Sequence, residues 1–263
     1  ATNSAGAGNT PTAGSVKIDG SNLGSALGGS IAATEISASR VAGCSIVLYT
    51  GNKTAGATVA HGLSQAPDMI HIKRLTGSAE SWISYLSTLG GGKHVYLNLN
   101  NAEVTASNVF NNTAPTSSVF SLGDADSTNA SGVPFIAFCF SSIPGFSKAG
   151  SFTGNNSTNG PVIDCGFSPA MVVTKKTNSA TGGEWLVVDS ARDHENPADL
   201  ESTWHSNANA EDNDQSSDHL DFLTTGFKMR CSGAGSHNAA SCTTFYMAWA
   251  ENPFAGSTPS PSR

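Results

Sequence analysis

The densest group of side chains that could perform catalysis lies in the last third of the chain. It consists of three carboxylates and two imidazoles: Asp193, His194, Glu195, Asp199 and His205. Paired carboxylates can serve as the acid and base of a glycoside hydrolase, and histidine can move protons near neutral pH. An earlier segment with a similar pattern has Gly90-Gly91-Gly92-Lys93-His94 at this place. We therefore predict a variable surface loop, with a carbohydrate-active site as the alternative.

The same polar stretch contains a tryptophan, Trp204. Aromatic rings stack on the CH-rich faces of sugars, while neighbouring amides and carboxylates hold the hydroxyl groups. Exposing the apolar ring of a tryptophan to water in a polar loop costs free energy unless a partner covers it. If the loops bind a glycan, we expect the contact residues to be Trp204, Asp199, Asn207 and Asn209.

Two acidic stretches, 124–129 and 211–218, offer oxygen atoms at short spacing. Neither has the order of acidic, glycine and glutamate residues that a calcium loop of the EF-hand type requires, so we predict solvated turns. The seven histidines show no HxH or HExxH spacing. A nucleophile elbow, a phosphate-binding loop and a dinucleotide fingerprint are also missing from the sequence. The patterns thus predict no catalytic residue, no metal and no cofactor.

The elements that would position these loops follow a pattern that occurs twice. Tyr49-Thr50-Gly51-Asn52 is answered by Phe152-Thr153-Gly154-Asn155, and Trp185 lies 103 residues after Trp82. Both copies also contain a basic pair, Lys73-Arg74 and Lys175-Lys176, and both end in an apolar strand before a proline. A period of this length corresponds to a whole small domain.

Between the ends of the chain the local pattern favours β-strands. Short runs rich in β-branched and aromatic residues are bounded by Gly, Asn, Ser or Pro, and no apolar helical period persists for three turns. Single helical turns are expected only near 96–100 and 200–204. We predict an all-β protein with two tandem antiparallel β-sandwiches of jelly-roll or concanavalin-like type, related by internal duplication, and with an extended N-terminal arm. Trp82 and Trp185 alternate with polar neighbours in strand patterns, and both are expected in the cores together with Trp249.

The predicted boundaries follow from composition. Residues 1–43 form an arm with weak strands, 44–146 the first sandwich, 147–255 the second, and 256–263 a tail. The Ala/Gly/Ser/Thr-rich start has too few apolar side chains to offset its ordering entropy, so we expect it to be ordered only by a neighbouring chain.

Composition also restricts the partners. Charged residues make up only 13% of the chain and the net charge is −7, which disfavours binding to nucleic acid. No apolar run approaches the roughly 18 to 20 residues of a membrane-spanning helix, so we expect no membrane insertion. The five cysteines lack CxxC spacing and are expected to be buried thiols from a reducing cytoplasm, and Cys231 with Cys242 is the one pair considered for a disulfide.

Several of these motifs also occur, in the same order, in a known family. They include His61-Gly62-Leu63, the run from Thr113 to Gly123, Asn129-Ala130-Ser131-Gly132, Gly150-Ser151-Phe152-Thr153-Gly154-Asn155 and Ala250-Glu251-Asn252-Pro253-Phe254. Over about residues 31–255 the chain resembles tail-fibre-like virion proteins of marine and cyanobacterial bacteriophages, which carry concanavalin-like β-sandwich units. The resemblance implies a structural role on the virion and host-surface recognition, with no catalytic or binding residues to carry over.

Two hypotheses follow. The first is a non-enzymatic virion protein, a tail fibre, spike or capsid-surface component. It would be assembled in the host cytoplasm with copies of itself and other virion proteins, and would touch host glycans. The second is a polysaccharide hydrolase or depolymerase on the same fold, using Asp193, Glu195 and Asp199.

Overall fold

The computed structural model describes residues 16–23, 27–181, 183–191, 202–204 and 220–253. The protein is predominantly β, with several antiparallel sheets and only two four-residue helices in the described residues. The chain divides into two compact units. Unit 1 comprises Ala1–Leu97 and Val104–Ser142, and unit 2 comprises Asn98–Glu103 and Ile143–Arg263.

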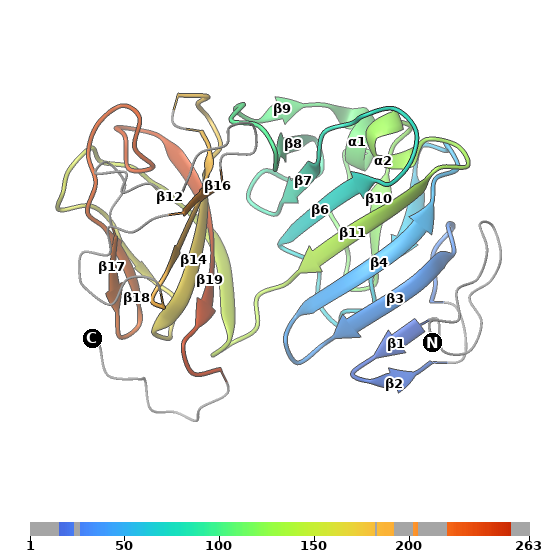
Figure 1. The fold of residues 1–263 in the computed structure, drawn as a ribbon, viewed down its shortest axis with the longest axis horizontal. Helices are drawn as coiled ribbons and strands as arrows, with labels where there is room; N and C mark the ends of the chain where they lie inside the picture. The colour runs from blue at the N-terminus through green and yellow to red at the C-terminus, as the bar shows by residue number, and fades with distance from the viewer. Residues whose placement is uncertain (1–15, 24–26, 182, 192–201, 205–219, 254–263) are drawn as a thin grey trace. The chain divides into compact units, whose positions relative to one another are not determined.

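The large sheet of unit 1 is built from nine strands. They are β1 (Val16–Ile18), β2 (Ser21–Asn22), β3 (Ala33–Ser39), β4 (Cys44–Thr50), β6 (Met69–Arg74), β7 (Ile83–Leu86), β8 (Lys93–Tyr96), β9 (Val104–Thr105) and β11 (Pro134–Phe140). Their order in the sheet is β2-β1-β3-β4-β11-β6-β7-β8-β9, and Figure 1 shows β3, β4, β11 and β6 side by side. All pairings are antiparallel except that of β1 with β3.

Unit 1 has a second sheet of two strands, β5 (Ala57–Ala60) and β10 (Val119–Leu122). Helices α1 (Ser107–Phe110) and α2 (Asp126–Asn129) flank β10 in the sequence. Residues of both sheets contribute to one core, in which Tyr49 stacks on Phe135 at 5.3 Å and meets the edge of Phe120 at 6.0 Å. Buried and partly buried residues alternate strictly along β11, so one face of this strand lies in the core.

Unit 2 has a five-stranded and a three-stranded sheet. The strands are β12 (Ser147–Thr153), β13 (Val162–Asp164), β14 (Pro169–Lys176), β15 (Trp185–Asp189), β16 (Ser202–Trp204), β17 (Leu220–Leu223), β18 (Gly226–Met229) and β19 (Thr243–Ala250). The larger sheet has the order β12-β19-β14-β15-β16 and the smaller β13-β18-β17. One core joins them, with Phe227 against Phe152 and Tyr246.

The expected all-β character is confirmed, and the weak strands expected before Val41 are present as β1 and β3. The two expected helical turns are wrong: Ser202–Trp204 is a strand, and residues 97–100 continue from β8 without a helix. The helices lie instead at α1 and α2, and α2 occupies the stretch for which solvated turns were expected. Residues 1–15 of the predicted N-terminal arm lie outside the described residues.

All five cysteines are free thiols, so Cys231 and Cys242 are not bridged. Trp185 is buried as expected, whereas Trp82 and Trp249 are only partly buried. Among the described residues no helix is long and apolar enough to cross a membrane.

Candidate functional site

The residues singled out in the sequence fall almost entirely outside the described part of the chain. Asp199, Asn207 and Asn209 lie there, as do the alternative catalytic residues Asp193 and Glu195. Trp204 is described only by its backbone, as the last residue of β16, where it pairs with Trp185. The predicted glycan contacts and the predicted acid and base therefore stay predictions.

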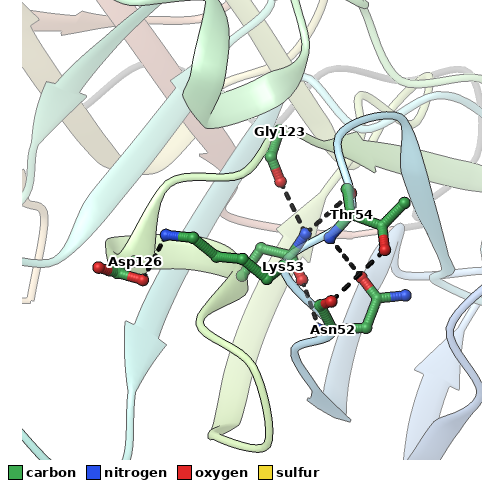
Figure 2. A network of polar contacts seen from close by, with 6 residues as sticks. Asn52, Lys53, Thr54, Gly123 and Asp126 are labelled. Atoms are coloured by element: carbon green, nitrogen blue, oxygen red, sulfur yellow. Dashed lines mark hydrogen bonds and ion pairs between the residues drawn. The ribbon is translucent and has the colours of Figure 1, made fainter.

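The described residues hold a polar arrangement at a Gly-Asn turn of unit 1. Asn129 is fully buried, and its side-chain oxygen accepts a hydrogen bond from the backbone N–H of Asn52 at 2.9 Å. Its amide nitrogen donates to the carbonyl oxygens of Thr54 at 3.1 Å and Gly123 at 2.7 Å. We call this the Asn129 clamp, because one buried side chain fixes the turn that follows β4. Figure 2 labels its partners Asn52, Thr54 and Gly123.

A second clamp of the same kind lies in unit 2. Asn238 is fully buried; its side-chain oxygen accepts from the backbone N–H of Asn155 at 3.0 Å. Its amide nitrogen donates to the carbonyl oxygens of Ser157 and Cys231, both at 2.8 Å. The Asn238 clamp thereby joins the turn that follows β12 to the loop between β18 and β19, in which Asn238 lies.

Close to the Asn238 clamp the interior of unit 2 is polar. Nδ1 of His237 lies 2.5 Å from Oγ1 of Thr174, and Oγ1 of Thr244 donates to the His237 carbonyl at 2.8 Å. The thiol of Cys242 donates to the same carbonyl at 3.1 Å. All four side chains are buried, so the loop that carries His237 is held by hydrogen bonds.

Lys176, at the end of β14, is buried beside this cluster with no exposed surface. Its Nζ donates to three carbonyl oxygens: Thr181 at 2.6 Å, Ala234 at 3.2 Å and Gly235 at 3.3 Å. Three acceptors match the three N–H groups of an ammonium. Lys176 therefore ties the loop after β14 to the loop before β19 and places a positive charge between them.

These two loops and the turn after β12 enclose an open pocket of about 320 Å³ within unit 2. Its rim carries the exposed side chains of Asn156, Asn178 and Ser241, and its inner wall includes Lys176 and Cys242. None of the lining residues that the structure describes is acidic. The size lies at the lower end of the roughly 300–1,000 Å³ of small-molecule sites, and amides and hydroxyls can bind a polar ligand.

The rim amides keep part of their hydrogen-bonding capacity. Asn178 accepts from the backbone N–H of Thr243 at 2.9 Å and donates to the Ser241 carbonyl at 3.3 Å. Oδ1 of Asn156 accepts from the backbone N–H of Gly233 at 2.6 Å, while its Nδ2 makes no hydrogen bond to the described residues. The two side chains are thus held in place by one set of bonds and present remaining donors at the pocket.

Beside the Asn129 clamp, unit 1 carries an ion pair. Nζ of Lys53, next to Asn52, lies 2.6 Å from a carboxylate oxygen of Asp126, and both side chains are exposed (Figure 2). The hydrogen bond and charge of Lys53, aided by the charge of Arg74, lower the pKa of Asp126. The described residues hold no group of three or more His, Cys, Asp or Glu side chains arranged as metal ligands.

Sequence reasoning missed both clamps and the pocket, although signals were present. The run from Asn129 to Gly132 was used only as a motif of the family resemblance, and the basic pair of Lys175 and Lys176 only as a marker of the repeat. A lysine pair at the end of an apolar strand places one charge on each face of the sheet, and one of these must enter the interior. That pattern was the available signal for Lys176.

A comparison with family models matches residues 5–253 to a family described as a domain of unknown function (DUF7483). The chain belongs to this family. Comparisons with curated proteins and with solved structures find no match. The matched residues include both units and the pocket, and the family's description names no activity.

Proposed function

We propose that this chain is a structural component of a bacteriophage particle, a fibre, spike or capsid-surface protein, that binds host-surface glycans and performs no chemistry. The observation that carries the proposal is the unit 2 pocket, bordered by Asn156, Asn178 and Ser241. Sugars are uncharged polyols for the most part, and amides with hydroxyls complement them. The low content of charged residues, 13%, suits such a surface, and the motif resemblance to virion proteins supports its location.

We further propose that the two units are tandem β-sandwiches that arose by duplication. The order β4-β11-β6-β7-β8 in unit 1 is matched by β12-β19-β14-β15-β16 in unit 2. The Asn129 clamp and the Asn238 clamp make corresponding hydrogen bonds to the turn after the first of these strands. Long-range contacts of this kind are unlikely to arise twice by chance in one order of strands.

A particle that carries many copies of the chain carries many copies of the unit 2 pocket. Linked sites gain avidity because the second binding event is intramolecular, so modest affinity per pocket suffices for attachment. The partners in this proposal are copies of the chain, other virion proteins and the host glycan, on the tail or capsid surface after assembly in the host cytoplasm.

The test is to incubate the purified protein with host surface polysaccharide and to measure both binding and polysaccharide chain length. The proposal expects saturable binding with chain length unchanged. Sustained cleavage that disappears in Asp193→Asn or Glu195→Gln would show a carbohydrate-active enzyme instead. Absence of binding, in a sample whose folding is checked by circular dichroism, would reject glycan attachment.

A further inference from the structure

The inner wall of the unit 2 pocket includes a buried cation, Lys176, and the cation at the matching strand position of unit 1, Arg74, acts electrostatically on a carboxylate. In unit 1, Phe135 of β11 pairs with Arg74 of β6. In unit 2, Thr244 of β19 pairs with Lys176 of β14. Strands β11 and β19 are the second strands of the two matched orders. On their other side, Phe135 pairs with Tyr49 of β4, and Thr244 pairs with Phe152 of β12. Arg74 and Lys176 therefore occupy equivalent positions.

The clamps extend this correspondence to the loops. Asp126 is the third residue before Asn129, and Gly235 is the third residue before Asn238. Lys53 follows Asn52, the residue held by the Asn129 clamp. In the same way Asn156 follows Asn155, which the Asn238 clamp holds. Gly235 therefore stands where unit 1 has Asp126, and Asn156 stands where it has Lys53.

The two places differ in charge. In unit 1 the carboxylate of Asp126 is paired with Lys53 and lies in the field of Arg74. In unit 2 the cation Lys176 is retained, but among the described residues its Nζ meets only carbonyl oxygens and no acidic side chain lines the pocket. A buried positive charge without a counter-ion favours an anion in the space beside it.

We propose that the unit 2 pocket binds the carboxylate of an acidic sugar, such as a uronic acid, in the place that Asp126 fills in unit 1. Nδ2 of Asn156 and the hydroxyl of Ser241 donate hydrogen bonds to the ligand at the rim, and Lys176 supplies the positive potential from behind the pocket wall. Hydrogen bonds to a charged group are the stronger ones in proteins. This inference rests on the proposed glycan attachment and names its ligand class.

The position of Gly235 allows a direct test. A Cβ added to Gly235 meets no heavy atom within 4 Å, and its φ lies outside the left-handed region, so a side chain is tolerated there. Gly235→Asp supplies the carboxylate that unit 1 has, and Gly235→Asn is its uncharged control. Asn156→Asp is a second variant, which keeps the oxygen that accepts from Gly233 but replaces the donor by an acceptor.

Binding of glucuronic acid, glucose and acetate to the full chain is measured by NMR titration of backbone amides. We expect shifts in the loop residues 233–242 with glucuronic acid, weaker binding of glucose and of acetate, and a loss of affinity of at least about tenfold in Gly235→Asp and Asn156→Asp, but not in Gly235→Asn. Acetate binding as tightly as glucuronic acid would show a general carboxylate site and overturn the sugar assignment. Glucose binding as tightly as glucuronic acid, or Gly235→Asp binding like Gly235→Asn, would overturn the role of the carboxylate.

The same variants separate this inference from the proposed function. If the wild-type protein binds host polysaccharide and Gly235→Asp binds it equally well, the acidic-sugar pocket is wrong and glycan attachment stands. If neither protein binds host polysaccharide while glucuronic acid still titrates the pocket, the attachment proposal fails and the pocket assignment stands. If glucuronic acid produces no shifts in residues 233–242, the pocket assignment fails.

Discussion

The side chain of Asn129 accepts a hydrogen bond from the backbone of Asn52 at 2.9 Å, across 77 residues of sequence. Asn129 has no exposed surface, so every one of its polar atoms must be satisfied inside the protein. The fold of unit 1 thus depends at this turn on one side chain, and unit 2 depends in the same way on Asn238.

Asn129→Ala and Asn238→Ala should each destabilise the protein by at least about 2 kcal/mol, because each removes a buried side chain that bonds two carbonyl groups and one N–H group, of which the carbonyl of Gly123 or of Cys231 is buried. Urea unfolding followed by circular dichroism measures the change. Asn108→Ala is the matched control, since Asn108 is exposed and its side chain makes no hydrogen bond to the described residues. Equal stability of Asn129→Ala and Asn108→Ala would show that the clamp contributes nothing.

Gly154, next to Asn155, should tolerate no side chain. A Cβ at this position would overlap the Ala239 carbonyl and lie 2.7 Å from Sγ of Cys242. Gly154→Ala should therefore cost about 1 to 3 kcal/mol or more, whereas Gly235→Ala, with nothing within 4 Å of its added Cβ, should stay within about 0.5 kcal/mol of wild type. The two variants are compared by thermal unfolding. A Gly154→Ala protein as stable as Gly235→Ala would mean that the turn is not packed against the Asn238 loop.

The strands could be predicted from the sequence because their physics is local. Alternation of apolar and polar residues, as in the run from Pro134 to Phe140, marks a half-buried strand without knowledge of its neighbours. The two similar halves that matched turn residues predicted stay a prediction.

The clamps and the pocket could not be predicted, because they depend on partners that are distant in the sequence. A buried asparagine such as Asn238 has the same local surroundings as a surface asparagine, and only its contact with Asn155, 83 residues earlier, distinguishes the two. Lys176 presents the same difficulty, since its burial is acceptable only because loops on both sides supply carbonyl oxygens.

His71 should make the protein sensitive to mild acid. Burial lowers the pKa of His71 to about 4, from 6.5, and its Nδ1 lies 2.7 Å from Oγ of Ser84. Between pH 6.5 and 4 the unfolded chain binds a proton that the folded chain does not, so stability falls as the pH falls through this window. The loss should be on the order of 3 kcal/mol. In His71→Gln this part of the pH dependence should disappear from urea unfolding curves, and an unchanged pH dependence would contradict the assignment.

Lys175 predicts a second rise of stability with pH, in the alkaline range. It is fully buried, and its Nζ donates to the carbonyl oxygens of Leu99, Asn101 and Gly183. Burial lowers its pKa from 10.5 to about 8, against the opposing effect of the negative charge of Glu184. Between these two values the unfolded chain keeps a proton that the folded chain has released. Stability should therefore rise as the pH increases from about 8 to 10.5.

Urea unfolding at a series of pH values across this window measures the effect for Lys175→Met, which removes the titrating group and keeps an apolar side chain of similar length. The free energy of unfolding of the wild-type protein should rise by roughly 2 to 3 kcal/mol across this window, and that of Lys175→Met should not show this rise. Lys17→Met is the control, because Lys17 is exposed on β1 and its loss should leave the pH dependence in place. The same rise in Lys175→Met as in Lys17→Met would show that Lys175 does not titrate between these values in the folded protein.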